Sequence, residues 1–167
     1  MNYRNIIDKG TLILKNSSIL SAKLDAELLL TFTLNIPREK ILLNLEKKLN
    51  KSEIINYLKL LNKRKKKEPI SSISGKKFFW KYEFLLNQDV LAPRSETELL
   101  VEEVLKILKF SNNINVLDVG IGSGCILISL LKERKQWRGI GLDISALAIK
   151  IAKINAKIQH VENRIKF

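Results

Sequence analysis

A run of three glycines between two carboxylates is the part of the sequence best suited to chemistry. Residues Val116–Gly124 read VLDVGIGSG, so that Asp118 is followed by glycines at positions 120, 122 and 124. Glycine adopts positive φ at low cost and lets a ligand reach the backbone N–H groups at the start of a helix. Asp143 follows 19 positions after Gly124, at the end of the next apolar stretch. An acidic residue at about that distance accepts hydrogen bonds from ribose hydroxyls, so the spacing predicts a nucleotide-like ligand.

The residues of this loop favour S-adenosylmethionine over NAD. A dinucleotide-binding loop reads G-x-G-x-x-G, and its third glycine would fall at the position of Cys125. Asp118 places a carboxylate beside the loop, which suits a ligand that has a cationic ammonium and no pyrophosphate. An NAD-dependent oxidoreductase is therefore the disfavoured alternative. A plainer interpretation is that the glycines and aspartates only close turns.

The elements that must position these residues follow a strand, loop and helix order. The pattern predicts strands over 114–119 and 139–143, a helix after the loop from Cys125, a second helix capped by Ser145, and the start of a third strand at 164–167. This is the first part of a βαβ arrangement, so we expect an α/β chain that ends in an incomplete Rossmann-like domain. Its short sheet would leave apolar faces and edges exposed, making this segment less stable than the rest.

The first part of the chain predicts a small helical bundle. Apolar residues recur at helical spacing in four segments: Tyr3–Leu14 with a break near Gly10, Ser21–Leu34, a helix that begins at Pro37, and a helix capped by Ser52 with Ile54, Ile55, Leu58 and Leu61 facing inward. The cationic run 63–67 fits a solvated helix end, and a partner-binding patch is the alternative.

Alternating aromatic residues predict a β-hairpin between two domains. Phe78, Trp80, Tyr82 and Phe84 indicate a strand over 77–86, followed by a turn at 87–89 and a return strand at 90–92. Ser95 and Glu98 have the spacing of a capping box for the next helix. The predicted organisation is a helical bundle over 1–67, a hairpin linker over 68–93 and a partial Rossmann-like domain over 94–167.

Composition narrows the class of protein. The 167 residues carry a net charge of +13, one cysteine and one histidine. We therefore expect a cytoplasmic protein without disulfides or a metal site, and we see no membrane segment. Of the 30 basic residues only 7 are arginine, which indicates a general bias toward lysine rather than specific nucleic-acid recognition.

The order of these segments resembles one family. The stretch EPISSISGKKFFWKYEFLLNQDVLAPRSETELLVEEVL, followed by VLDVGIGSG and GLDIS, is similar to the HemK-type glutamine methyltransferases, which methylate a glutamine side-chain amide of peptide chain release factors. Ser95 stands where the family usually has a second proline. The resemblance implies S-adenosylmethionine binding by Asp118, Gly120, Ile121, Gly122, Ser123, Gly124 and Asp143, and a supporting or substrate role for Arg94, Glu96 and Thr97. Asn155-Ala156 matches an asparagine-alanine pair of the family.

One family motif is absent from these residues. The family's acceptor site is an Asn-Pro-Pro-Tyr segment, and the prolines here are Pro37, Pro69 and Pro93, none of them adjacent. We therefore expect a truncated or split form with no catalytic residues of its own, inactive alone, whose sheet a second chain could complete. The alternative is a non-catalytic basic module that docks a release factor or a ribosomal partner.

Overall fold

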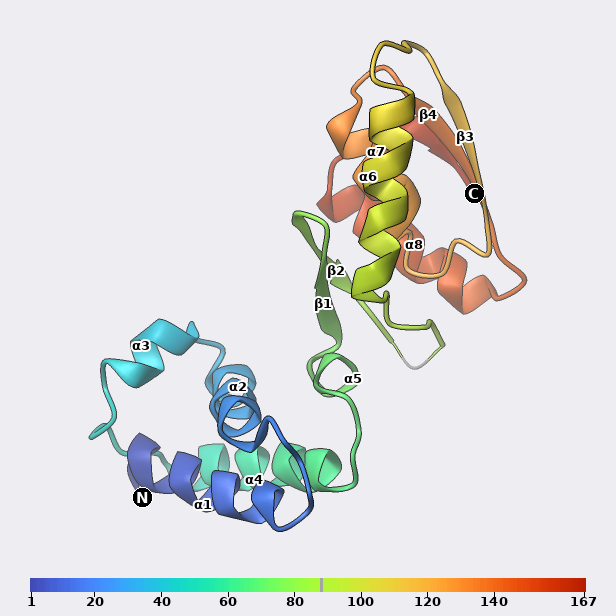
Figure 1. Cartoon of the computed structure of the whole chain (residues 1–167). Coiled ribbons are helices and arrows are strands. Elements are labelled where there is room, and N and C mark those ends of the chain that lie inside the picture. The colour runs from blue at the N-terminus through green and yellow to red at the C-terminus, as the bar shows by residue number, and fades with distance from the viewer. Residues whose placement is uncertain (88) are drawn as a thin grey trace. The chain divides into compact units, whose positions relative to one another are not determined.

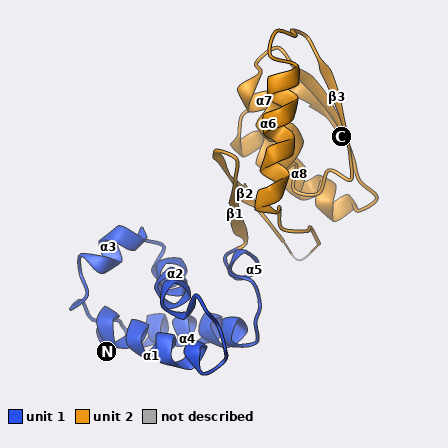
Figure 2. Cartoon of the chain, viewed as in Figure 1, with its two compact units in different colours: residues 1–74 blue, residues 75–167 orange. Residues whose placement is uncertain are grey.

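The structure, a computed structural model, describes residues 1–87 and 89–167. They form two compact units, 1–74 and 75–167, which are coloured separately in Figure 2. Each unit has its own apolar core, and each is described by itself below.

The first unit consists of helices. Their bounds are α1 Tyr3–Lys15, α2 Ala22–Leu34, α3 Arg38–Leu42, α4 Lys51–Lys65 and α5 Ile70–Ser74 (Figure 1). Leu14, Leu29 and Leu30 are fully buried in the core that α1, α2 and α4 share. Two buried acids are paired: Asp25 binds Arg64 at 2.7 Å, and Glu27 binds Arg38 at 2.6 Å. Arg64, the second residue of the cationic run, therefore belongs to the fold of this unit.

The predicted break at Gly10 is wrong. Helix α1 continues through this residue, which is buried against α4 and α2. A Cβ atom built on Gly10 would overlap the Tyr57 hydroxyl and lie 3.3 Å from the Cβ of Ala26. Glycine is present here because two helices approach closely, and the sequence pattern around it does not carry that information.

The start of α4 also differs from the prediction. Its N-cap is Asn50 rather than Ser52: the Asn50 side chain accepts from the Glu53 N–H at 2.9 Å, and the Glu53 carboxylate accepts from the Asn50 N–H at 2.8 Å. This reciprocal arrangement satisfies two otherwise unpaired donors. The buried face of α4 carries Tyr57 and Leu61, whereas Ile55 and Leu58 are exposed, contrary to expectation.

The second unit combines a hairpin with a parallel sheet and three helices. Its elements are β1 Lys76–Phe79, β2 Tyr82–Leu85, a 3-10 turn Ser95–Thr97, α6 Glu98–Ile107, β3 Asn115–Val119, α7 Cys125–Glu133, β4 Arg138–Leu142, α8 Ala146–Ile158, a 3-10 turn Glu162–Arg164 and β5 Ile165–Lys166. Strands β3, β4 and β5 are parallel and lie in that order. The sequence correctly predicts α7, the two full strands and the start of a third.

The hairpin is present, but its turn lies within the predicted first strand. Strands β1 and β2 pair antiparallel with Phe79 opposite Tyr82, so the chain reverses at Trp80 and Lys81. Trp80 takes up the left-handed φ of 57° that this tight turn requires. Residues 90–92 do not form the expected return strand. The turn predicted at 87–89 includes Gln88, which lies outside the described residues.

The capping box predicted at Ser95 and Glu98 is wrong. The 3-10 turn occupies Ser95–Thr97, and α6 begins at Glu98 with Thr97 as its N-cap. Among the described residues, Thr97 makes no side-chain capping hydrogen bond.

One face of the parallel sheet is covered, and the other is open. Helices α6 and α7 lie on one side of β3 and β4 (Figure 1), where Val101, Leu127 and Ile128 are fully buried. The opposite face carries four exposed apolar side chains: Leu117 (59%), Val119 (74%), Ile140 (44%) and Leu142 (47%). The exposed apolar face expected from the sequence is therefore present, and we call these four residues the open face.

Candidate functional site

The glycine loop between β3 and α7 is held by β4. The N–H groups of Gly120 and Ile121 both donate to the Leu142 carbonyl, at 2.8 and 2.9 Å. The loop closes where the Gly124 N–H donates to the Ile121 carbonyl at 2.8 Å, and α7 begins at the next residue. The loop thus lies at the carboxyl ends of neighbouring parallel strands, where ligands bind in open α/β sheets.

Two of the glycines are required by this geometry. Gly120 has φ +80°, and a Cβ built there would meet no atom within 4 Å, so the backbone faces open space. Gly124 has φ +83° and caps α7, and a Cβ built there would lie 2.6 Å from the Ile128 Cδ1 atom. A side chain at Gly120 would extend into this open space, and one at Gly124 would disturb the packing of α7.

Asp143 lies just after β4 and binds the loop. Its Oδ2 atom accepts from the Gly122 N–H at 2.9 Å, and its Oδ1 atom accepts from the Ser145 N–H at 2.9 Å. These bonds from Ser145 and Gly122 lower the pKa of the Asp143 carboxyl below its ordinary value. Ser145 caps α8 as predicted, accepting from the Ala148 N–H at 3.2 Å. Asp143 is therefore held as an anion, and each of its oxygens can still accept a further hydrogen bond.

Asp118 differs from Asp143 in its surroundings. Its Oδ2 atom is buried and has no hydrogen-bond partner within the described part of the chain. Burial raises the pKa of the Asp118 carboxyl, and the charge of Asp143 acts in the same direction, while a backbone hydrogen bond from Leu127 opposes both. A buried acceptor without a partner is costly, so a cationic donor at this position would be stabilising.

A cavity of about 510 Å³ opens at the carboxyl ends of β3 and β4. It is lined by Val119, Gly120, Leu142, Asp143 and Ile144. Ile144 is fully exposed, although it is a large apolar residue. The cavity therefore combines one carboxylate with apolar walls, a composition that suits a ligand with both an apolar ring and hydroxyl groups.

The structure places the other predicted site residues differently. Ile121 and Ser123 are buried, at 4% and 2% exposure, so their side chains belong to the core below the loop. Arg94 and Glu96 are exposed and Thr97 is half-buried, and none of the three lines the cavity. In this arrangement they are not brought to the glycine loop.

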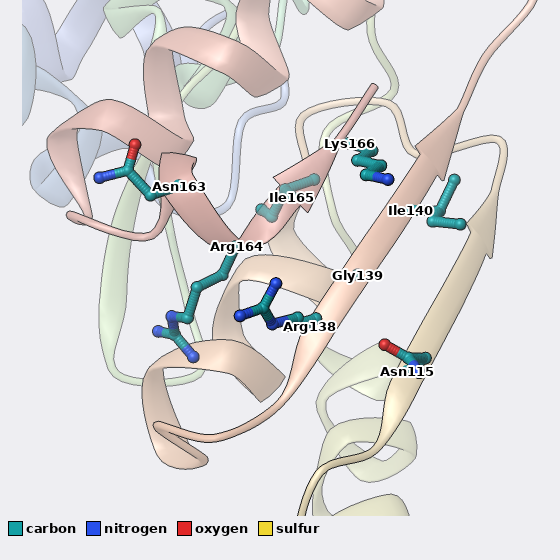
Figure 3. Close-up of a pocket in the computed structure, with 8 residues that line it drawn as sticks. All are labelled: Asn115, Arg138, Gly139, Ile140, Asn163, Arg164, Ile165 and Lys166. Carbon is teal, nitrogen blue, oxygen red and sulfur yellow. The ribbon is translucent and has the colours of Figure 1, made fainter.

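A second hollow, of about 260 Å³, lies near the amino ends of the strands (Figure 3). Its lining includes Asn115, Arg138, Arg164 and Lys166. The Arg164 guanidinium donates to the carbonyls of Leu131 and Arg134 at 2.8 and 2.9 Å, which closes the carboxyl end of α7. Because this end of a parallel sheet does not normally carry the ligand, we place the candidate site at the glycine loop.

Two residues that tie helices of the second unit to the hairpin were not among the predicted site residues. Asn155 on α8 is 1% exposed and bonds to both Ser123 and Leu85. Glu133 at the end of α7 accepts from the Trp80 Nε1 atom and the Tyr82 hydroxyl, both at 3.0 Å. For Asn155 the asparagine-alanine pair was a signal, whereas no local pattern marks Glu133.

Comparison with known proteins agrees with this geometry. Residues 5–75 match the family described as PrmC N-terminal domain, and residues 110–167 match one described as methyltransferase domain. The release factor glutamine methyltransferase of Leptospira interrogans is 43% identical over 97% of this chain and 57% of its own length. That of Buchnera aphidicola is 40% identical over 98% of this chain and 58% of its own.

The parallel sheet, the glycine loop and the matched domain define a Rossmann-like methyltransferase domain that follows a helical unit. The helical unit has its own match, to the PrmC N-terminal domain. The chain is similar over most of its length to release factor glutamine methyltransferases. It spans somewhat more than half the length of the two relatives named above.

A more distant likeness exists among solved structures. A SAM-dependent methyltransferase from Geobacter sulfurreducens, in complex with S-adenosyl-L-homocysteine, superposes on 40% of this chain and 26% of its own with 30% identity and a TM-score of 0.36. A superposition this limited adds no support for fold or function. No helix among the described residues is long and apolar enough to cross a membrane.

Proposed function

We propose that the second unit binds S-adenosylmethionine at the glycine loop and that the whole protein methylates a glutamine side-chain amide of a release factor in the cytoplasm. The observation that carries the proposal is the pairing of two carboxylates with an open glycine loop. Asp143 is fixed by the Gly122 N–H, and Asp118 has a buried oxygen without a partner among the described residues.

The residues present fit this cofactor. The free lone pairs of Asp143 are suited to ribose hydroxyls, the partnerless oxygen of Asp118 to a cationic ammonium, and the bare backbone of Gly120 to close approach. When bound, the cofactor supplies a sulfonium methyl group that is open to nucleophilic attack. The chain's own part is to hold the cofactor at the carboxyl ends of β3 and β4 and to fix its orientation.

Calorimetric titration with S-adenosylhomocysteine tests cofactor binding. We expect the wild-type chain to bind, and Asp118→Asn to bind more weakly because its neutral amide cannot replace the carboxylate. Binding to the wild type should weaken as the pH falls and Asp118 becomes protonated. This should happen at a higher pH than for an ordinary aspartate, because burial raises the pKa of Asp118. Affinity that is equal in both proteins and flat with pH would rule out this role for Asp118.

We further propose that these 167 residues do not complete methyl transfer by themselves. An amide nitrogen is a poor nucleophile because its lone pair is delocalised, so it must be oriented by acceptors, and the Asn-Pro-Pro-Tyr segment is not among these residues. Incubation with labelled S-adenosylmethionine and a release factor should leave the factor unlabelled. Label transfer above background would contradict this proposal.

The open face is an argument for a further polypeptide segment that completes the sheet. A longer form of the protein or a second chain would contribute this segment. Leu117, Val119, Ile140 and Leu142 form an apolar surface on a parallel sheet, and such sheets are normally covered on both faces. The alternative of a purely basic docking module is less well supported, because Arg64 is already paired with Asp25.

A further inference from the structure

The side-chain amide of Asn155 joins the hairpin to the glycine loop. Its Oδ1 atom accepts from the Leu85 N–H at 2.8 Å, and its Nδ2 atom donates to the Leu85 carbonyl at 3.0 Å. The same Nδ2 atom donates to the Ser123 carbonyl at 2.8 Å. All three bonds lie within the second unit, in surroundings where Asn155 is 1% exposed.

These bonds satisfy both donors and the acceptor of the amide. Leu85, at the end of β2, offers its N–H and its carbonyl to Asn155 as it would to a neighbouring strand. The remaining N–H of the amide donates to the carbonyl of Ser123, which lies between Gly122 and Gly124 in the loop. A buried amide with fixed partners has one orientation, so the position of the Ser123 carbonyl depends on where β2 lies.

We propose that Asn155 is a positioning residue that couples the β1–β2 hairpin to the affinity of the glycine loop for its ligand. The inference rests on the proposed cofactor site and adds a second element that controls it. Coupling between two sites is reciprocal, so ligand bound at the loop also stabilises β2 around Leu85. The hairpin thereby takes part in cofactor binding without touching the cofactor.

The chain offers a control at the end of the same helix and on the same strand. Gln159, the C-cap residue directly after α8, donates from its Nε2 atom to the Glu83 carbonyl of β2 at 3.0 Å. This bond also ties α8 to the hairpin, but it does not involve the loop. Gln159→Ala therefore removes a contact to the hairpin and leaves the contact to the loop in place. Asn155→Ala removes its contacts to the hairpin and its contact to the loop.

Titration of the full 167-residue chain with S-adenosylhomocysteine gives the first readout. We expect Asn155→Ala to raise the dissociation constant about tenfold, which is about 1.4 kcal/mol, and Gln159→Ala to change it less than twofold. Equal effects of the two substitutions would mean that Asn155 acts only by holding the hairpin, and the proposal would be overturned.

Amide hydrogen exchange on the wild type gives the second readout and needs no variant. Adding S-adenosylhomocysteine should slow exchange at the Leu85 amide as well as in the loop. Slower exchange in the loop alone would overturn the proposal, even if Asn155→Ala fails to fold. If the wild type binds no S-adenosylhomocysteine, the cofactor proposal fails. The coupling is then judged from the NMR chemical shifts of the backbone amides. Asn155→Ala must change the shifts of Gly122 and Gly124, and Gln159→Ala must leave them unchanged.

Discussion

The Asp143 carboxylate accepts a hydrogen bond from the Gly122 N–H at 2.9 Å, so the tip of β4 fixes the middle of the glycine loop. The second oxygen of the same carboxylate accepts from the Ser145 N–H at the start of α8. One side chain therefore sets the loop and the following helix together. The binding role proposed for Asp143 therefore depends on the same side chain that holds the loop.

Substitution of Asp143 should weaken ligand binding in a graded way. We expect Asp143→Ala to cost about 1.5–3 kcal/mol of S-adenosylhomocysteine affinity, the range for hydrogen bonds to a charged group. Asp143→Asn keeps one acceptor oxygen and should cost less. Calorimetry measures both, and an alanine variant that binds as tightly as the wild type would exclude the proposed ribose contact.

Replacing Gly10 should destabilise the first unit, although alanine normally favours a helix. A Cβ at Gly10 would overlap the Tyr57 hydroxyl, and overpacking of this kind costs about 1–3 kcal/mol. We expect a lower midpoint of thermal unfolding for Gly10→Ala. The control is the same change combined with Tyr57→Phe, which removes the hydroxyl and should recover part of the loss. A helix stabilised by Gly10→Ala alone would contradict the observed packing.

Low pH should loosen the hairpin through Glu133. Although burial acts to raise it, the pKa of the Glu133 carboxyl is lowered from its ordinary value of 4.5 by the bonds from Lys81, Trp80 and Tyr82. Because the folded-state pKa is the lower one, the stabilisation is present above pH 4.5 and is lost as the pH falls through the lowered value. Trp80 fluorescence should report this loss in the wild type as the pH falls below 4.5.

Glu133→Gln is the matched control for this pH dependence. Its amide oxygen can still accept from Trp80 or Tyr82, but it does not titrate. The fluorescence change should therefore be smaller in the glutamine variant. A change of the same size and midpoint in both proteins would assign the pH effect to another group.

Charges on the open face should reduce self-association without unfolding the chain. We expect Leu117→Lys with Val119→Lys to lower the concentration dependence of the sedimentation coefficient, and to alter stability by no more than about 0.5 kcal/mol, as exposed positions do. Leu20→Lys with Leu43→Lys adds the same charge at exposed apolar residues of the first unit. If this control reduces association equally, net charge and not the open face is responsible.

Much of the fold was predictable where short-range patterns decide it. The glycines after Asp118 predict β3, the loop and α7, because positive φ and a helix start are local properties of the chain. The N-cap at Ser145 and the position of Asp143 after β4 follow for the same reason. The sequence also predicts the open face, since only two full strands of apolar residues are present to be covered.

Tertiary structure decided the features that depend on contacts between distant residues. The hairpin turns at Trp80 and Lys81, where Glu133, far along the chain, binds both Trp80 and Tyr82. The alternation of aromatic residues does not encode these contacts. Likewise, Gly10 looks like a helix break in sequence and is a packing contact with Tyr57 in three dimensions. A local pattern specifies conformation, whereas the partners of a buried polar or small residue are fixed only when the elements pack.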